Sequence, residues 1–126
     1  VSGISDDELV RLYAESEVAV VPSLYEGFSL PAVEAMACGV PLVATTGGAI
    51  PEVTGPDGSA ARLVPPADAG ALALALNELL ADPAARARLG AAGRQRAIER
   101  FTWRACAEKT VEQYCALLEL HAARSA

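Results

Sequence analysis

The sequence predicts an α/β fold in which short parallel strands alternate with helices. Three short apolar runs, at residues 18–21, 41–45 and 61–64, are bounded by proline, glycine or polar residues and have the composition of buried strands. Helix-forming stretches with capping residues precede, separate and follow these runs. Such an alternation favours a parallel sheet covered by helices.

The first residues predict the end of a strand and then a well-marked helix. Val1–Gly3 is typical of the last residues of a strand. Ser5 and Glu8 have the spacing of a capping box, so we expect a helix from about Asp6 to Glu15. The apolar residues on one face of this helix are Leu9, Leu12 and Tyr13.

The next strand leads into the loop that has the strongest functional signal. The run from Val18 to Val21 predicts a strand buried on both faces and closed by Pro22. Pro31 suits the first turn of a helix, and Gly39 suits its end. Open α/β sheets bind their ligands in the position of the intervening loop, beyond the carboxyl ends of the strands.

This loop has the chemistry of a site for a phosphate flanked by hydroxyl groups. Helix N-termini have free N–H groups and a partial positive charge, so the amides of residues 27–30 can receive a phosphate. Glu34, about one turn into the helix, is placed to accept bonds from two vicinal hydroxyls, and Glu26 lies across the same loop. Alone, each residue has an ordinary explanation, because glutamates complement helix dipoles and glycines form turns. Together they predict a nucleotide-sugar site.

The remainder of the chain predicts a turn, a strand and then three helices. Gly47 and Gly48 follow the second strand, and we expect their turn on the ligand side of the sheet. Asp68 is expected to cap one helix, Asp82 to cap the next, and Thr102 to cap a long last helix. The residues expected at core spacing in the first of these three helices are Leu72, Leu76, Leu79 and Leu80. Those on one face of the last are Ala107, Val111, Tyr114 and Leu118.

The helix after Asp82 is rich in arginine. Its arginines are Arg86, Arg88, Arg94, Arg96 and Arg100. A solvated face is the simpler interpretation, and a contact with a partner domain or an acidic acceptor is the alternative.

Composition limits the class of protein. With 126 residues the chain is at most one domain, and 52% apolar residues favour a globular interior. The net charge of −6 argues against nucleic acid or an anionic membrane as a partner of this chain. Because it has no signal peptide and no apolar run near about 18 residues, it is predicted to be cytoplasmic. A single lysine among abundant alanine indicates a GC-rich bacterial gene.

The cysteines and the lone histidine suggest no metal or disulfide chemistry. Cys38, Cys106 and Cys115 are odd in number and lack a Cys-x-x-Cys pair, so neither a disulfide framework nor a zinc site is indicated. We expect them to be small buried hydrophobic residues. No Ser/His/Asp arrangement can be built around His121.

The central segment resembles a known signature. Pro22 to Thr45 has the form Pro-Ser-x-x-Glu-Gly-Phe-x-Leu-Pro-x-x-Glu-Ala-Met-Ala-Cys-Gly-x-Pro-x-Val-Ala-Thr, with seven residues between its two glutamates. This pattern is similar to that of the retaining GT-B glycosyltransferases of the GT4 type. The segment Gly47–Val53 resembles the Gly-Gly-x-Pro-Glu loop of that family, and Phe101–Trp103 resembles its Phe-Ser-Trp before the last helix. The resemblance covers essentially the whole chain.

The resemblance implies roles for the loop residues. Glu34 would hold the ribose of the donor nucleotide, and Glu26, as the catalytic candidate, would contact hydroxyls of the transferred sugar near the reacting carbon. The amides of Gly27, Phe28, Ser29 and Leu30 would meet the sugar and the diphosphate. The family usually has glycine where Ser29 stands; if that position requires a positive φ, serine costs about 1 kcal/mol there.

The implied reaction transfers a sugar from a nucleoside diphosphate to a hydroxyl acceptor, with retention at the anomeric carbon. No carboxylate is assigned as a nucleophile. The sequence has no Asp-x-Asp motif, so neither a metal nor another cofactor is expected.

The resemblance also implies that residues 1–126 are part of a larger enzyme. Three strands match the second half of a Rossmann-like doubly wound sheet, the C-terminal donor-binding domain of a GT-B enzyme. The basic pair that neutralises the diphosphate and the acceptor-binding N-terminal domain would come from elsewhere in the protein, so this chain alone is expected to be inactive. The last helix would pack against that N-terminal domain. The same domain could also attach the enzyme peripherally to a membrane.

Two other classes of function are alternatives. A GT-B nucleotide-sugar epimerase shares the architecture but is expected to carry further acid/base residues. A non-catalytic nucleotide-binding α/β module would suit the small size. Such a module predicts a sheet without an exposed apolar edge, whereas a part of a larger sheet predicts an unpaired edge at Val18–Val21.

Overall fold

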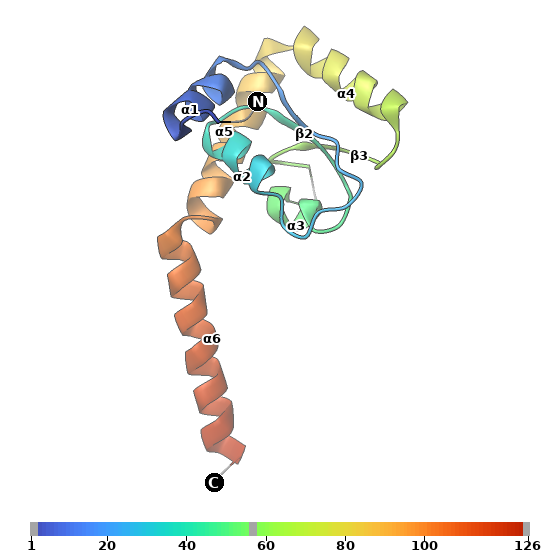
Figure 1. Ribbon diagram of the computed structural model, residues 1–126. Coiled ribbons are helices and arrows are strands. Elements are labelled where there is room, and N and C mark those ends of the chain that lie inside the picture. The colour runs from blue at the N-terminus through green and yellow to red at the C-terminus, as the bar shows by residue number, and fades with distance from the viewer. Residues whose placement is uncertain (1–2, 56–57, 125–126) are drawn as a thin grey trace.

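A computed structural model describes residues 3–55 and 58–124 and shows an α/β fold. Its sheet has three strands, and helices precede, separate and follow them (Figure 1). The elements are α1 (Asp6–Glu15), β1 (Ala19–Val21), α2 (Leu30–Ala37), β2 (Leu42–Thr45), α3 (Ile50–Thr54), β3 (Arg62–Val64), α4 (Ala69–Ala81), α5 (Pro83–Arg100) and α6 (Trp103–Arg124).

The sheet is parallel throughout, as predicted. Its order is β1-β2-β3, with Val20 opposite Val43 and Ala44 opposite Leu63. The carboxyl ends of the strands therefore share one edge of the sheet, where the loops after β1 and β2 meet. The predicted strand end at Val1–Gly3 falls largely on residues 1–2, which lie outside the described residues; Gly3 itself is not in a strand.

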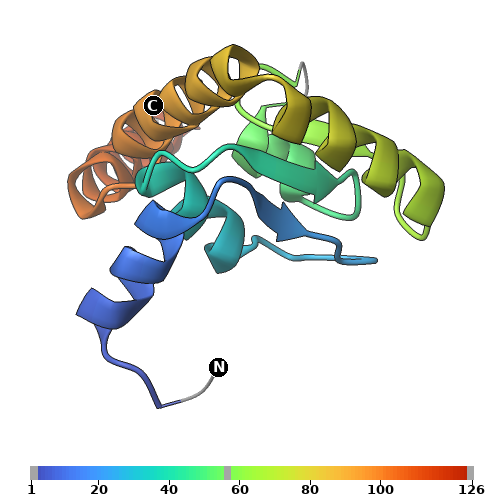
Figure 2. The ribbon, with the colours of Figure 1, turned by 90° about the horizontal axis from the view of Figure 1, so that it is seen from above.

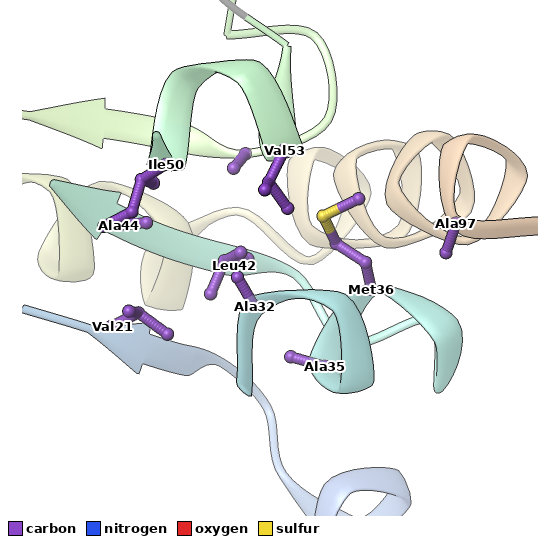
Figure 3. Close-up of a cluster of buried hydrophobic side chains, with 10 residues drawn as sticks. Val21, Ala32, Ala35, Met36, Leu42, Ala44, Ile50, Val53 and Ala97 are labelled. Atoms are coloured by element: carbon purple, nitrogen blue, oxygen red, sulfur yellow. The ribbon is translucent and has the colours of Figure 1, made fainter. Parts of the chain in front are cut away.

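The central strand β2 separates two apolar clusters. All four of its residues are buried, and alternate residues point to opposite faces. Leu42 and Ala44 belong to a cluster with residues of α2, α3 and the end of α5, and Met36 of α2 lies between them and Ala97 of α5 (Figure 3). Val43 packs against α4 and the beginning of α5 on the other face. The fold thus has a sheet between two helical layers, and α1 and α4 lie at opposite sides of the molecule in Figure 2.

Burial corrects two sequence predictions. Strand β1 is not buried on both faces, since Val20 is 40% exposed, and β1 pairs with β2 alone among the described strands. The unpaired apolar edge expected of a part of a larger sheet is therefore present. Leu80 of α4, which was expected at core spacing, is 48% exposed rather than in the core.

Local capping signals are confirmed. The Ser5–Glu8 capping box forms, with the Glu8 carboxylate accepting from the Ser5 N–H at 2.8 Å. These bonds lower the pKa of Glu8. Asp68 and Asp82 accept from Ala71 and Ala85 at 2.8 and 2.9 Å, and Thr102 caps α6 by accepting from Ala105 at 3.1 Å. The short helix α3, which includes Pro51, was not predicted.

Two glycines bring α5 against the turn that follows α2. Gly39 ends α2 as predicted, with a φ of 74° and its N–H donating to Met36. A Cβ on Gly90 of α5 would lie 2.2 Å from the Gly39 carbonyl oxygen. Only glycine at residue 90 therefore allows this close crossing.

Three arginines of α5 bind carbonyl groups at the ends of other helices. Helix C-termini leave carbonyls without partners and attract positive charge, and these side chains supply both needs. The interpretation of the arginines as a solvated face is therefore wrong for Arg86 and Arg96, which are half-buried, whereas Arg94 stays exposed. The bonds run from Arg86 to Leu79 and Leu80 of α4, from Arg94 to Ala37 of α2, and from Arg96 to Glu52 and Val53 of α3.

Helix α6 extends away from the rest of the molecule (Figure 1). It has 22 residues, none of them buried. The face that includes Val111, Tyr114 and Leu118 is exposed, as expected for a surface that needs a partner. Cys106 and Cys115 lie on α6 and are exposed, so their predicted burial is wrong, and Cys38 is only half-buried. No helix in the described part of the chain has the length and apolarity to cross a bilayer.

Candidate functional site

The loop between β1 and α2 holds Glu26 by its side chain. The Ser23 hydroxyl donates a hydrogen bond to Glu26 Oε1 at 2.7 Å. Thr45, at the end of β2, donates to the Ser23 carbonyl and so ties the loop to the neighbouring strand. Glu26 is half-buried, and the hydrogen bond that orients its carboxylate comes from a residue of the same loop.

The same loop is joined through its backbone to the glycine turn after β2. Glu26 forms a parallel bridge with Gly48, and the Ala49 N–H donates to the Glu26 carbonyl at 2.8 Å. A Cβ on Gly48 would lie 2.3 Å from the Glu26 carbonyl oxygen, and one on Gly47 would lie 2.5 Å from that of Leu24. The turn therefore lies on the predicted side of the sheet, and both glycines are required by close approach to the loop.

Ser29 begins α2 in an unusual conformation. Its φ is 77°, in the left-handed region, so the position does have the positive φ that the glycine of similar proteins suggested. Its side chain does not cap the helix, and the buried hydroxyl oxygen has no hydrogen-bond partner within the described part of the chain. The N-terminus of α2 thus opens toward the loop without a side-chain cap.

Glu34 lies on the exposed side of α2, next to α1. The Tyr13 hydroxyl of α1 donates to Glu34 Oε2 at 3.2 Å. Burial of the phenol, and then its bond to Glu34, raise the pKa of Tyr13 to about 12, so Tyr13 is a protonated donor at neutral pH. Both residues line an open hollow of about 340 Å³ between α1 and α2.

Phe28 links the loop to the far end of α5. Its ring meets that of Phe101 edge to face, with centroids 5.6 Å apart. Phe28 and Phe101 also line a largely apolar groove of about 510 Å³ beside the first turns of α6. Two residues of the Phe101–Trp103 motif thus have structural roles: Phe101 packs against the loop, and Thr102 caps α6. Trp103 is 92% exposed.

The structure brings most of the predicted site residues together. Glu26, Gly27, Phe28, Ser29 and Leu30 form one continuous loop and helix start, against the Gly47–Gly48 turn. Glu34 lies one turn further on, toward α1. In the part of the chain that the structure describes, no three His, Cys, Asp or Glu side chains group as a metal site.

Sequence reasoning missed two residues of this region. Tyr13 was placed on an apolar helix face without a polar role; a tyrosine there is a usable signal, since a half-buried phenol usually finds a hydrogen-bond partner. Ser23 carries no comparable signal, because serine is common in loops.

Known proteins resemble this chain in sequence and in fold. Residues 1–96 match the family model described as glycosyl transferases group 1. MMP α-(1→4)-mannosyltransferase of Mycolicibacterium hassiacum is 58% identical over 113 residues, which are 90% of this chain and 28% of that protein. Sucrose-phosphate synthase of Thermosynechococcus elongatus superposes with a TM-score of 0.82 at 42% identity, over 95% of this chain and 30% of that one.

A third similar protein carries a ligand. Anabaena HepE, solved in complex with UDP-glucose, has a TM-score of 0.75 at 26% identity, over 84% of this chain and 29% of that one. The chain spans less than a third of the length of each of these three proteins. Because the family model covers most of its residues, the chain belongs to the glycosyl transferases group 1 family.

Proposed function

We propose that this chain supplies donor-site residues to a nucleotide-sugar-dependent retaining glycosyltransferase of the GT4 type. The observation that carries the proposal is the loop of residues 26–30, which is fixed against the Gly47–Gly48 turn and opens on the N-terminus of α2. A helix N-terminus beside a held carboxylate suits a diphosphate joined to a sugar. The UDP-glucose complex of the similar Anabaena protein supports a nucleotide sugar as the donor.

Each residue has a distinct role in this proposal. Glu34 binds the ribose hydroxyls, and Glu26, oriented by Ser23, contacts hydroxyls of the transferred sugar. The amides of residues 27–30 meet the sugar and the diphosphate. As the bond to the anomeric carbon breaks, negative charge builds on the departing diphosphate, and preorganised amide donors stabilise it without reorganisation. The acceptor hydroxyl bonds to the anomeric carbon on the face from which the diphosphate leaves, as retention requires, and its proton passes to the departing diphosphate.

The whole enzyme needs more than this chain. Three parallel strands with β1 unpaired at one edge support a place in the second half of a larger donor-binding sheet. We propose that an N-terminal domain of the same protein binds the hydroxyl acceptor, that the reaction needs no metal, and that the enzyme acts in the cytoplasm. The name of the mannosyltransferase at 58% identity makes a mannosyl donor the first to test.

Nucleotide-sugar titrations of the full-length protein test the proposal. UDP-glucose, GDP-mannose and ADP-glucose would be titrated by ligand-detected NMR into wild type, Glu34→Ala and Glu26→Ala. We expect one donor to bind wild type, Glu34→Ala to lose most of that binding, and Glu26→Ala mainly to lose turnover. Glu78→Ala, in an exposed ion pair between α4 and β3, is the matched control and should change neither. Unchanged binding and turnover in both site variants would make the loop a scaffold and refute the proposal.

A further inference from the structure

We propose that Tyr13 is a positioning residue for the donor, whose hydroxyl holds the Glu34 carboxylate in the orientation that receives the ribose hydroxyls. The inference rests on the proposed function, because it deepens the role of Glu34. It assigns a task to α1, a helix that contributes no residue to the loop between β1 and α2.

The contact joins a fixed side chain to a mobile one. The Tyr13 ring packs against the core cluster that contains Met36 and Leu42, so its hydroxyl has a defined place. Glu34 stands on the exposed side of α2 and has three rotatable bonds. The 3.2 Å bond from Tyr13 to Glu34 Oε2 therefore selects one arrangement of the carboxylate among several.

The direction of the bond is set by the chemistry of the pair. The ionised carboxylate of Glu34 only accepts hydrogen bonds, whereas the phenol can donate its proton. Because burial and the bond to Glu34 raise the pKa of Tyr13 to about 12, the phenol keeps that proton throughout the neutral range. Tyr13 thus engages one side of Oε2 and leaves the remaining lone pairs of the carboxylate, including those of Oε1, for two vicinal hydroxyls.

There is space beside the pair for such a ligand group. The hollow of about 340 Å³ that Tyr13 and Glu34 line is also bounded by Leu9 of α1 and Cys38 at the end of α2. The carboxylate therefore faces an open volume rather than a packed interface.

A purely structural role for the bond makes a different prediction. If the bond only ties α1 to α2, its loss lowers stability, and donor affinity falls only as far as the protein loosens. If it positions Glu34, its loss lowers affinity in a way that needs both Glu34 and the ribose hydroxyls.

The test measures donor affinity by calorimetry on the full-length protein. The variants are Tyr13→Phe, Glu34→Ala and the double variant, titrated with whichever of UDP-glucose, GDP-mannose and ADP-glucose binds wild type, and with its 2′,3′-dideoxyribose analogue. Ser16→Ala is the matched control, because it removes a hydroxyl bond, to the Leu12 carbonyl, from the end of the same helix. Thermal unfolding of every variant measures the loss of stability separately.

We expect Tyr13→Phe to raise the Kd about threefold to tenfold, because the freed Glu34 side chain must then be ordered when the donor binds. It should add nothing in the Glu34→Ala background and should have no effect on the dideoxy donor. Ser16→Ala should leave the Kd unchanged. Suppose that Glu34→Ala binds the donor weakly, as proposed. The inference is then overturned if Tyr13→Phe has the Kd of wild type, or if Tyr13→Phe lowers donor affinity equally with and without Glu34→Ala. If Glu34→Ala itself binds as tightly as wild type, the proposed role of Glu34 fails, and the inference fails with it.

Discussion

Ser29 combines two unfavourable features in one residue. Its backbone is in the left-handed region at a φ of 77°, and its buried hydroxyl has no partner among the described residues. Each feature alone costs roughly 1 kcal/mol or more. Such a residue at the start of α2, inside the candidate site, is typical of strain kept for function.

Replacing Ser29 with glycine is expected to stabilise the fold. Ser29→Gly relieves the left-handed backbone and removes the unpaired hydroxyl, so urea denaturation should show a gain of about 1 kcal/mol. Ala67→Gly is the control, because Ala67 has a φ of 60° but is exposed and has no buried hydroxyl. Its gain should be smaller. A loss of stability in Ser29→Gly would mean that the hydroxyl has a partner in the native protein.

Gly48 is expected to tolerate no side chain. In Gly48→Ala the new Cβ would lie 2.3 Å from the Glu26 carbonyl oxygen, so the loop must move or the turn must unfold. We expect a loss of stability of about 3 kcal/mol by urea denaturation, together with loss of donor binding. Gly3→Ala is the control that distinguishes backbone strain from a steric clash. Gly3 also has a positive φ, of 77°, but no atom lies within 4 Å of a Cβ placed on it. Equal effects of the two substitutions would show that the contact with Glu26 is not what requires glycine.

At the scale of the element, α5 organises its neighbours through arginine. The guanidinium of Arg96 donates from Nε to Val53 and from Nη2 to Glu52, at 2.7 and 2.8 Å. We expect Arg96→Met to cost about 1–3 kcal/mol in thermal or urea unfolding, since α3 loses the donors at its C-terminus. Arg96→Lys should recover only part of this, because an ammonium cannot reproduce the two-pronged geometry. Arg88→Met, at an exposed position of the same helix, should change little; an equal loss there would contradict a specific role for Arg96.

The contact between α1 and α2 predicts a pH dependence of stability. The folded state raises the pKa of Tyr13 from its ordinary 10.0 to about 12, chiefly by burial and then by the bond to Glu34. The folded protein therefore retains a proton that the unfolded chain loses, so this contribution is complete below about pH 10 and declines as the pH rises toward 12. Burial raises the pKa of Cys38 as well, so wild type must be compared with Tyr13→Phe. Urea unfolding at pH 8 and pH 11 should show a smaller decline in Tyr13→Phe, and equal declines would contradict the assignment.

The elements could be predicted from the sequence wherever their signals are local. Ser5, Asp68, Asp82 and Thr102 cap helices through bonds to residues three positions away, and such signals are contained in the sequence itself. The contacts of Arg96 span more than forty residues, and that of Tyr13 with Glu34 spans 21, so neither follows from a local pattern. Helix α3 has only five residues, too few for a periodic signal.

The candidate site was predictable in part for the same reason. The loop of residues 26–30 could be found because strand, loop and helix start are contiguous. The bridge between Glu26 and Gly48 joins the loop after β1 to the turn after β2. The sequence shows that residue 48 is glycine, but it does not show which segment approaches that glycine. The cysteines of α6 were predicted to be buried because the sequence of a helix does not show whether a partner covers it.

At the scale of the whole molecule, α6 is a long helix that lies apart from the sheet and its two helical layers (Figure 1). None of its residues is buried, and helices gain most of their stability in water from tertiary packing. In the 126-residue chain produced alone, we expect the amides of α6 to exchange with deuterium far faster than those of β2. In the full-length protein the α6 amides should become protected. Strong protection of α6 in the chain alone would contradict the need for a covering partner.

The bridge between Glu26 and Gly48 also determines how the site can open. Because the loop is bonded along its backbone to the turn and no gap for a side chain separates them, the two segments form one rigid unit. Because the two segments move together, opening of the loop is not expected to be the step that releases a ligand. We therefore expect the residence time of a nucleotide donor to depend on the part of the full-length protein that covers the loop. Substitutions on that covering surface, rather than in the loop, are the ones that should alter the rate of product release.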